Sequence, residues 1–117
     1  MSVRWIAAAG FGMVLVAASA SAQDAKLVER GKKLYAEQKC GMCHSLEGKG
    51  SANALKGPLD DTGTKNSAEE LRQWLINPKE MTVKTKSTRK PPMPSYAKLA
   101  KEDVEALVAY MQTLKKK

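Results

Sequence analysis

The sequence has few of the residues that build reactive sites and large apolar cores. Its 117 residues include one histidine, two cysteines and one phenylalanine, and aromatic residues make up only 5% of the chain. A chain this short has room for one small domain, and so few large apolar side chains leave that domain in need of further stabilisation. A disulfide between cysteines three positions apart would close almost no loop and contribute little. A large apolar cofactor would supply the missing core.

The N-terminal segment is predicted to be a secretory signal peptide. Arg4 precedes an uncharged stretch whose apolar part, residues 5–18, is shorter than the roughly 20 residues that cross a bilayer. The stretch ends at Ala22 in an A-x-A cleavage pattern. We therefore expect a signal peptide at residues 1–22 and a mature periplasmic domain at residues 23–117, with no stable membrane insertion after cleavage. The alternative, a retained N-terminal anchor, is disfavoured by the short apolar run.

Three segments have helical patterns of apolar residues, and no segment shows the alternation typical of a β-strand. The first predicted helix covers residues 25–38. The second begins at a capping box formed by Ser67 and Glu70, and Pro78 stops it. The third covers residues 101–115, where acidic residues at the start and lysines at the end suit the helix dipole.

Long segments without helical periodicity separate these three helices. Residues 45–66 are rich in Gly, Ser, Asn, Asp and Lys, and residues 79–94 carry Lys, Thr and Ser before the sequence KPPMP. Loops this long are uncommon in a compact domain unless they have a function of their own. The sequence therefore predicts an all-α fold with three main helices and long loops wrapped around a bound group.

Both cysteines and the only histidine lie in one stretch, KCGMCHSLEGKG, at residues 39–50. A zinc site is disfavoured because it needs about four ligands, whereas Cys40, Cys43 and His44 are the whole supply of Cys and His. A thiol–disulfide centre is disfavoured because its Cys-x-x-Cys normally begins a helix within a βαβ pattern, whereas this pair follows a predicted helix.

A covalently attached haem uses all three residues of this motif. Two thiols three positions apart can each bond to one of the two vinyl groups on neighbouring edges of a porphyrin. The imidazole that follows can then bind the iron from one face. The sequence thus predicts one haem c per chain, attached through Cys40 and Cys43, with His44 as an iron ligand.

The second axial ligand must be another residue type, and a methionine sulfur is the natural candidate. Met42 is too close to the attachment motif to reach the far face of a haem, and Met111 lies on the apolar stripe of the last predicted helix. Met81 and Met93 remain. We favour Met93, because the prolines of KPPMP restrict the backbone of a loop that must present one sulfur rigidly.

Together these segments resemble the class I cytochromes c, and in particular their small bacterial monohaem members. GKKLYAEQKCGMCHS is similar to the first helix and haem motif of that family, LVAYMQTL to its last helix and MPSYAKL to the segment of its sixth ligand. The resemblance implies that Gly31 lets the first and last helices cross closely and that Trp74 faces the haem. It also implies that Met93 is the sixth ligand and that the carbonyl of Pro58 accepts a hydrogen bond from His44.

The function implied is that of a soluble periplasmic one-electron carrier rather than an enzyme. With both axial positions filled, no open site remains for oxygen or peroxide chemistry. Two other functions stay open. The protein could be a ligand-binding or sensor haem protein if Met93 is labile, or a fixed electron-transfer subunit of a larger redox complex.

The chain is basic, with a net charge of +8, or +7 without Arg4. Basic chains often bind nucleic acid, but secretion and the haem motif argue against that partner here. Positive residues cluster just before Met93, in what we call the basic loop: Lys84, Lys86, Arg89 and Lys90. We expect them to attract redox partners with acidic docking surfaces, and we expect the protein to be a monomer.

Overall fold

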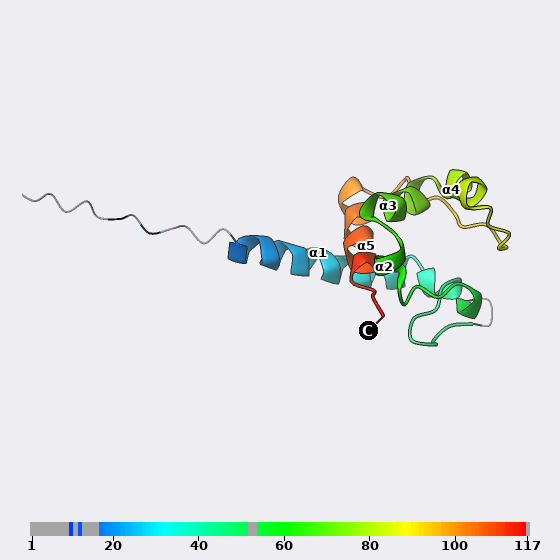
Figure 1. Ribbon diagram of the computed structural model, residues 1–117, viewed down its shortest axis with the longest axis horizontal. Coiled ribbons are helices and arrows are strands. Elements are labelled where there is room, and N and C mark those ends of the chain that lie inside the picture. Colours follow the sequence, from blue (N-terminus) through cyan, green and yellow to red (C-terminus); the bar gives the residue numbers. More distant parts are fainter. Residues whose placement is uncertain (1–9, 11, 13–16, 52–53, 117) are drawn as a thin grey trace, which may run out of the picture.

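The computed structural model describes residues 10, 12, 17–51 and 54–116, so most of the predicted signal peptide lies outside the described residues. Within them the chain is helical, without a β-strand, as predicted (Figure 1). No helix in this part of the chain has the length and apolar character needed to cross a membrane. The α-helices are α1 (Ala17–Glu37), α2 (Thr62–Lys65), α3 (Ala68–Ile76), α4 (Pro78–Thr85) and α5 (Lys101–Gln112), and the 3-10 helices are η1 (Cys40–Met42) and η2 (Ala54–Lys56).

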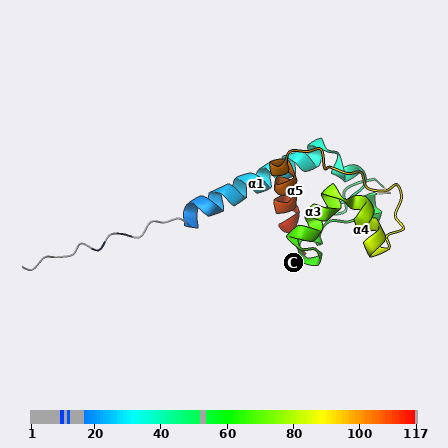
Figure 2. The same ribbon diagram turned by 90° about the horizontal axis from the view of Figure 1, so that it is seen from above.

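Helices α1 and α5 cross in direct contact (Figures 1 and 2). A Cβ atom at Gly31 would overlap the carbonyl oxygen of Ala106 and lie 2.7 Å from Cβ of Tyr110, so only glycine allows the two backbones this approach. Beside the crossing, the rings of Tyr35 and Tyr110 pack edge to face with their centroids 5.7 Å apart. The close crossing expected at Gly31 is confirmed.

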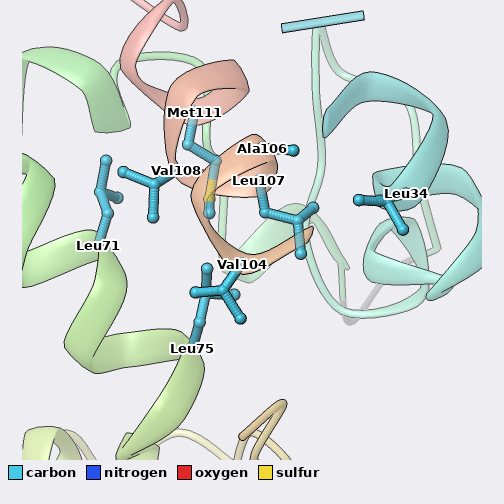
Figure 3. Packing of buried hydrophobic residues seen from close by; sticks show 8 residues of the cluster. All are labelled: Leu34, Leu71, Leu75, Val104, Ala106, Leu107, Val108 and Met111. Atoms are coloured by element: carbon cyan, nitrogen blue, oxygen red, sulfur yellow. The ribbon is translucent and has the colours of Figure 1, made fainter. Parts of the chain in front are cut away.

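The apolar core lies where α5 packs between α1 and α3. Figure 3 shows side chains from these three helices converging on α5, where Leu107 and Val108 are almost fully buried. The predicted capping box holds the start of α3, with Glu70 N to Ser67 Oγ and Ser67 N to Glu70 Oε1 both 3.1 Å. The buried cluster is small and consists of Leu34, Leu71, Leu75, Val104, Ala106, Leu107, Val108 and Met111.

Helix α4 lies in a segment that was expected to be a loop, so that prediction is wrong for residues 79–85. Pro78 ends α3, as expected, but it also occupies the first turn of α4. Proline suits that position, since its fixed φ is helical and the missing N–H would have no partner there. Apolar periodicity could not have shown this helix, because Met81 is one of only two buried residues in an otherwise polar segment.

Candidate functional site

The motif of cysteines and histidine forms a tight turn directly after α1, which we call the attachment turn (residues 40–44). Lys39, with φ 57°, redirects the chain at the end of α1. The amides of Cys43 and His44 then both donate to the carbonyl oxygen of Cys40, at 3.1 and 3.0 Å. Both thiols are free and half-buried. Hydrogen bonds within the turn therefore bring the two thiols and the imidazole close together.

The attachment turn lines a cavity of about 450 Å³. This volume lies within the range of ligand pockets in proteins. Trp74 lines the cavity from α3, together with Leu71 and Leu75. The loop between α4 and α5 adds further lining, and it lies at the same end of the molecule as the attachment turn (Figures 1 and 2). The walls are thus largely apolar, with two thiols and one imidazole at one side.

His44 is held in one tautomer. Its Nδ1 lies 2.9 Å from the carbonyl oxygen of Gly57. Because a carbonyl only accepts, Nδ1 carries the proton and Nε2 keeps a lone pair that can bind a metal. Burial lowers the pKa of His44, the hydrogen bond to Gly57 opposes that shift, and the charge of Arg89 adds to it. The imidazole is therefore neutral at neutral pH, which is the form that ligates iron.

The accepting carbonyl was expected to be that of Pro58, and this prediction is wrong. The N–H of Leu59 donates to the carbonyl oxygen of Ser45 at 3.0 Å. In a trans peptide the C=O and N–H groups point in opposite directions, so the carbonyl of Pro58 points away from Ser45. The preceding peptide presents the Gly57 carbonyl to His44 instead. Because Leu59 follows Pro58 directly, its hydrogen bond to Ser45 turns the Pro58 carbonyl away, and the carbonyl that faces His44 is the one before it in the chain.

Three methionines line the cavity: Met42, Met93 and Met111. Met42 belongs to the attachment turn itself and is 64% exposed. Met93 is half-buried in the loop between α4 and α5 and lines the cavity. Met111 also lines it but is buried within the core cluster, as expected of its position on α5. Met81 is 6% exposed and lines a second hollow, beside the end of α3. Met93 is thus the methionine that a loop, rather than a packed helix, presents to the cavity.

The segment after Met93 is fixed to α3. The N–H of Tyr96 donates to the carbonyl oxygen of Leu75 at 2.7 Å, and the hydroxyl of Ser95 donates to that of Ile76 at 3.0 Å. Both acceptors are at the C-terminal end of α3, where carbonyls have no partner within the helix. These two bonds fix the chain on one side of Met93.

The protonation of Cys40 argues against a thiol–disulfide centre. Burial raises the pKa of the Cys40 thiol to about 11, its backbone hydrogen bond opposes that shift only in part, and the neighbouring Cys43 adds to it. Redox-active dithiols work through a thiol of lowered pKa, which is a thiolate near neutral pH. Within the described residues, no group of three or more His, Cys, Asp or Glu side chains could hold a metal ion. The haem interpretation is the one that the geometry of the turn supports.

Arg89 was assigned to the exposed basic loop, and the structure places it differently. Its side chain is half-buried, lines the cavity and donates a hydrogen bond to the carbonyl oxygen of Cys43. Lys84, Lys86 and Lys90 are exposed, as expected. The spacing of basic residues gave no sign of this inward position. The only signal was that Arg89 is the one arginine among lysines, and its planar group is the better hydrogen-bond donor.

The profile of the cytochrome c family matches residues 28–115. The chain belongs to the cytochrome c family. It is also 28% identical over 100 residues to cytochrome c oxidase subunit 2 of Alkalihalophilus pseudofirmus, an alignment that covers 76% of this chain and 26% of that protein. The chain thus spans about a quarter of the length of this relative. No solved structure matches it.

Family membership implies a covalently bound haem c and a role in electron transfer. Cytochromes c are in general electron carriers rather than enzymes. The residues of the cavity fit such a group, because two thiols adjoin an imidazole whose Nε2 is free to bind iron. The apolar walls from α3 suit a porphyrin, whose large apolar faces would complete the small core.

Proposed function

We propose that this protein is a periplasmic one-electron carrier that holds a single haem c with His/Met axial ligation. The observation that carries this proposal is that Cys40, Cys43, His44 and Met93 line one cavity, although Met93 is far from the other three in sequence. All four residues are of the types that His/Met cytochromes c use. The lining of the cavity is also mainly apolar, which suits such a group.

Each residue has a distinct task. Cys40 and Cys43 form the thioether bonds that attach the haem. His44 binds the iron through Nε2, and the hydrogen bond from Nδ1 to Gly57 fixes the plane of its ring and makes it a stronger donor. Met93 would supply the second, sulfur ligand, and Trp74 would line one wall of the haem site. When bound, the haem iron supplies the redox chemistry by alternating between its ferric and ferrous states.

The hydrogen bonds around Met93 favour a carrier over a sensor. A sensor needs an axial position that opens to an external ligand, whereas a carrier keeps both ligands through the redox cycle. The bonds from Ser95 and Tyr96 to the end of α3 restrain the segment next to Met93. A methionine held in this way would stay on the iron through the redox cycle, as a carrier requires.

The periplasmic location rests on the predicted signal peptide at residues 1–22. Helix α1 begins at Ala17, so cleavage after Ala22 would remove its residues 17–22 and leave residues 23–37. The crossing at Gly31 lies within the retained part. We propose that the mature domain, residues 23–117, is a monomer that does not insert into the membrane and does not bind nucleic acid.

The partners proposed are redox proteins with acidic docking surfaces. Lys84, Lys86 and Lys90 are exposed and lie just before the segment that contains Met93. Charges at this end of the molecule would orient an acidic partner toward the cavity. Contacts between electron-transfer proteins are small, typically below about 1,200 Å² in total, so steering rather than tight binding would govern the rate.

A second candidate function is that of a fixed electron-transfer subunit in a larger redox complex. The similarity to an oxidase subunit 2 is the observation that favours it. Purification without detergent from the periplasm as a monomer would support the free carrier. Co-purification with membrane-bound subunits at constant stoichiometry would support the second candidate.

The haem content of the purified protein tests the proposal. A pyridine haemochrome spectrum should show one haem of the c type per chain, and acid–acetone should extract none of it. The ferric protein should also show the weak red absorption band that sulfur ligation produces. Haem that acid–acetone extracts, or a protein that binds none, would contradict the proposal.

A further inference from the structure

Arg89 connects two segments that are distant in sequence. It belongs to the loop after α4, and its guanidinium donates to the carbonyl oxygen of Cys43, 46 residues away. Cys43 immediately precedes His44 in the attachment turn. The loop of Arg89 also contains Met93, four positions further on. One side chain therefore joins the segments of both proposed axial ligands.

The guanidinium also lies against Gly57. A Cβ atom at Gly57 would overlap Nη1 of Arg89 and lie 2.8 Å from Nη2, so the space that Arg89 occupies exists only because this residue is glycine. Gly57 is the residue whose carbonyl accepts the hydrogen bond from His44. Arg89 thus contacts both the residue that precedes His44 and the residue whose carbonyl accepts the hydrogen bond from the imidazole.

We propose that Arg89 is a positioning residue that fastens the loop of residues 86–94 to the attachment turn and thereby keeps Met93 in place. Ser95 and Tyr96 restrain the loop after Met93 through α3. Arg89 restrains it before Met93. A methionine restrained on both sides dissociates less readily from iron, and this consequence rests on the ligation proposed above. The restraint of the loop by Arg89 does not depend on that ligation.

A charged donor makes this restraint stronger than an ordinary hydrogen bond. Hydrogen bonds that involve an ionised partner contribute more than neutral pairs, and arginine keeps its charge at any relevant pH. Losing such a bond should shift the balance between the fastened and the open loop about 10-fold or more. Lys90, the next residue, is exposed and offers a matched control with the same change of charge.

The first test measures the affinity of imidazole, an uncharged ligand, for the ferric protein. Imidazole must displace Met93, so its affinity reports how readily the loop opens. In Arg89→Gln we expect an affinity about 10-fold higher than in the native protein. Lys90→Gln should leave the affinity unchanged. Equal affinities in the two variants would overturn the proposal.

Gly57→Ala tests the same contact without removing a charge. Its methyl group would occupy the position of the guanidinium, so Arg89 must move away. We expect imidazole affinity to rise as in Arg89→Gln. Since both changes act on one contact, the double variant should show no more than the effect of either single change. Additive effects would mean that Gly57 acts independently of Arg89 and would overturn the fastening.

Hydrogen–deuterium exchange separates the fastening from the identity of the sixth ligand. The amides of residues 86–90 should exchange about 10-fold faster in Arg89→Gln and Gly57→Ala than in Lys90→Gln. Absence of sulfur ligation in the native protein would contradict the proposed function but leave this comparison intact. Unchanged exchange in Arg89→Gln would overturn the role of Arg89 even if Met93 binds the iron.

Discussion

The two regions that supply the proposed iron ligands are built in different ways. In the attachment turn, Cys40, Cys43 and His44 are adjacent in sequence, and backbone hydrogen bonds to one carbonyl hold them together. Met93 lies in a loop whose position depends on α3 and on Arg89, which are distant in sequence. The attachment turn should keep its geometry when residues elsewhere in the chain are substituted. The loop of Met93 should become more mobile with each distant contact that is lost. Changes in the turn should therefore abolish haem attachment, and changes around the loop should give graded effects.

Removal of both thiols should have the largest effect. In Cys40→Ala/Cys43→Ala we expect no covalently attached haem, because these are the only cysteines of the chain. Any residual haem should be extracted completely by acid–acetone, and the protein should fold poorly without a group that fills the cavity. Covalent haem that survives in this variant would contradict the local attachment.

Met93→Ala should retain the haem but open its sixth position. We expect a lower reduction potential, because a sulfur ligand favours the ferrous state. Carbon monoxide should bind the ferrous protein, which the native protein should exclude. The visible spectrum and an electrochemical titration would measure both effects.

Met81→Ala is the matched control for Met93→Ala. Met81 is a buried residue of α4, so its loss should lower the free energy of unfolding by about 2–5 kcal/mol without changing the spectrum. Thermal unfolding followed by circular dichroism would measure the loss. If instead Met81→Ala opened the iron to carbon monoxide and Met93→Ala did not, the loop assignment would be wrong while the family stood.

The exposed lysines of the basic loop should affect rates rather than structure. Electrostatic steering raises association rates about 10- to 1,000-fold, and salt removes most of that gain. Replacing Lys84, Lys86 and Lys90 with Gln should flatten the dependence of electron-transfer rate on ionic strength and leave the spectrum unchanged. Stopped-flow kinetics with an acidic redox protein would measure it. A native rate that does not fall with salt would show that these lysines do not steer the partner.

The smallest effect is expected at the start of α3, outside both ligand regions. Ser67→Ala removes one hydrogen bond of the capping box and should lower the free energy of unfolding by about 1 kcal/mol. Neither the spectrum nor the reduction potential should move. A change in potential would mean that α3 transmits strain to the loop through Tyr96 and Ser95.

The sequence was sufficient for the elements whose signals are local. The capping box of α3, the apolar stripe of α5 and the attachment motif each depend on residues a few positions apart. Helix α4 was missed because its sequence is polar and offers little apolar periodicity. The partner of His44 was misplaced by one residue because the direction of the Pro58–Leu59 peptide depends on a hydrogen bond to Ser45.

The inward position of Arg89 lay beyond any sequence pattern. It depends on the absence of a side chain at Gly57 and on the carbonyl oxygen of Cys43, 46 residues away in the sequence. Neither contact produces a periodic pattern in the sequence. Trp74 and Met93 were predicted to lie near the haem from the resemblance to the family and from the prolines of the loop, and both line the cavity. The signal peptide stays a prediction, since most of it lies outside the described residues.

Proton NMR of the reduced protein tests the central claim most directly. A methionine methyl group bound to haem iron lies above the porphyrin, whose ring current shifts its resonance far upfield. We expect one such resonance in the native protein, its presence unaffected in Met81→Ala and its complete loss in Met93→Ala. A native spectrum without a shifted methyl resonance, or a resonance that persists in Met93→Ala, would contradict the ligation of haem by His44 and Met93.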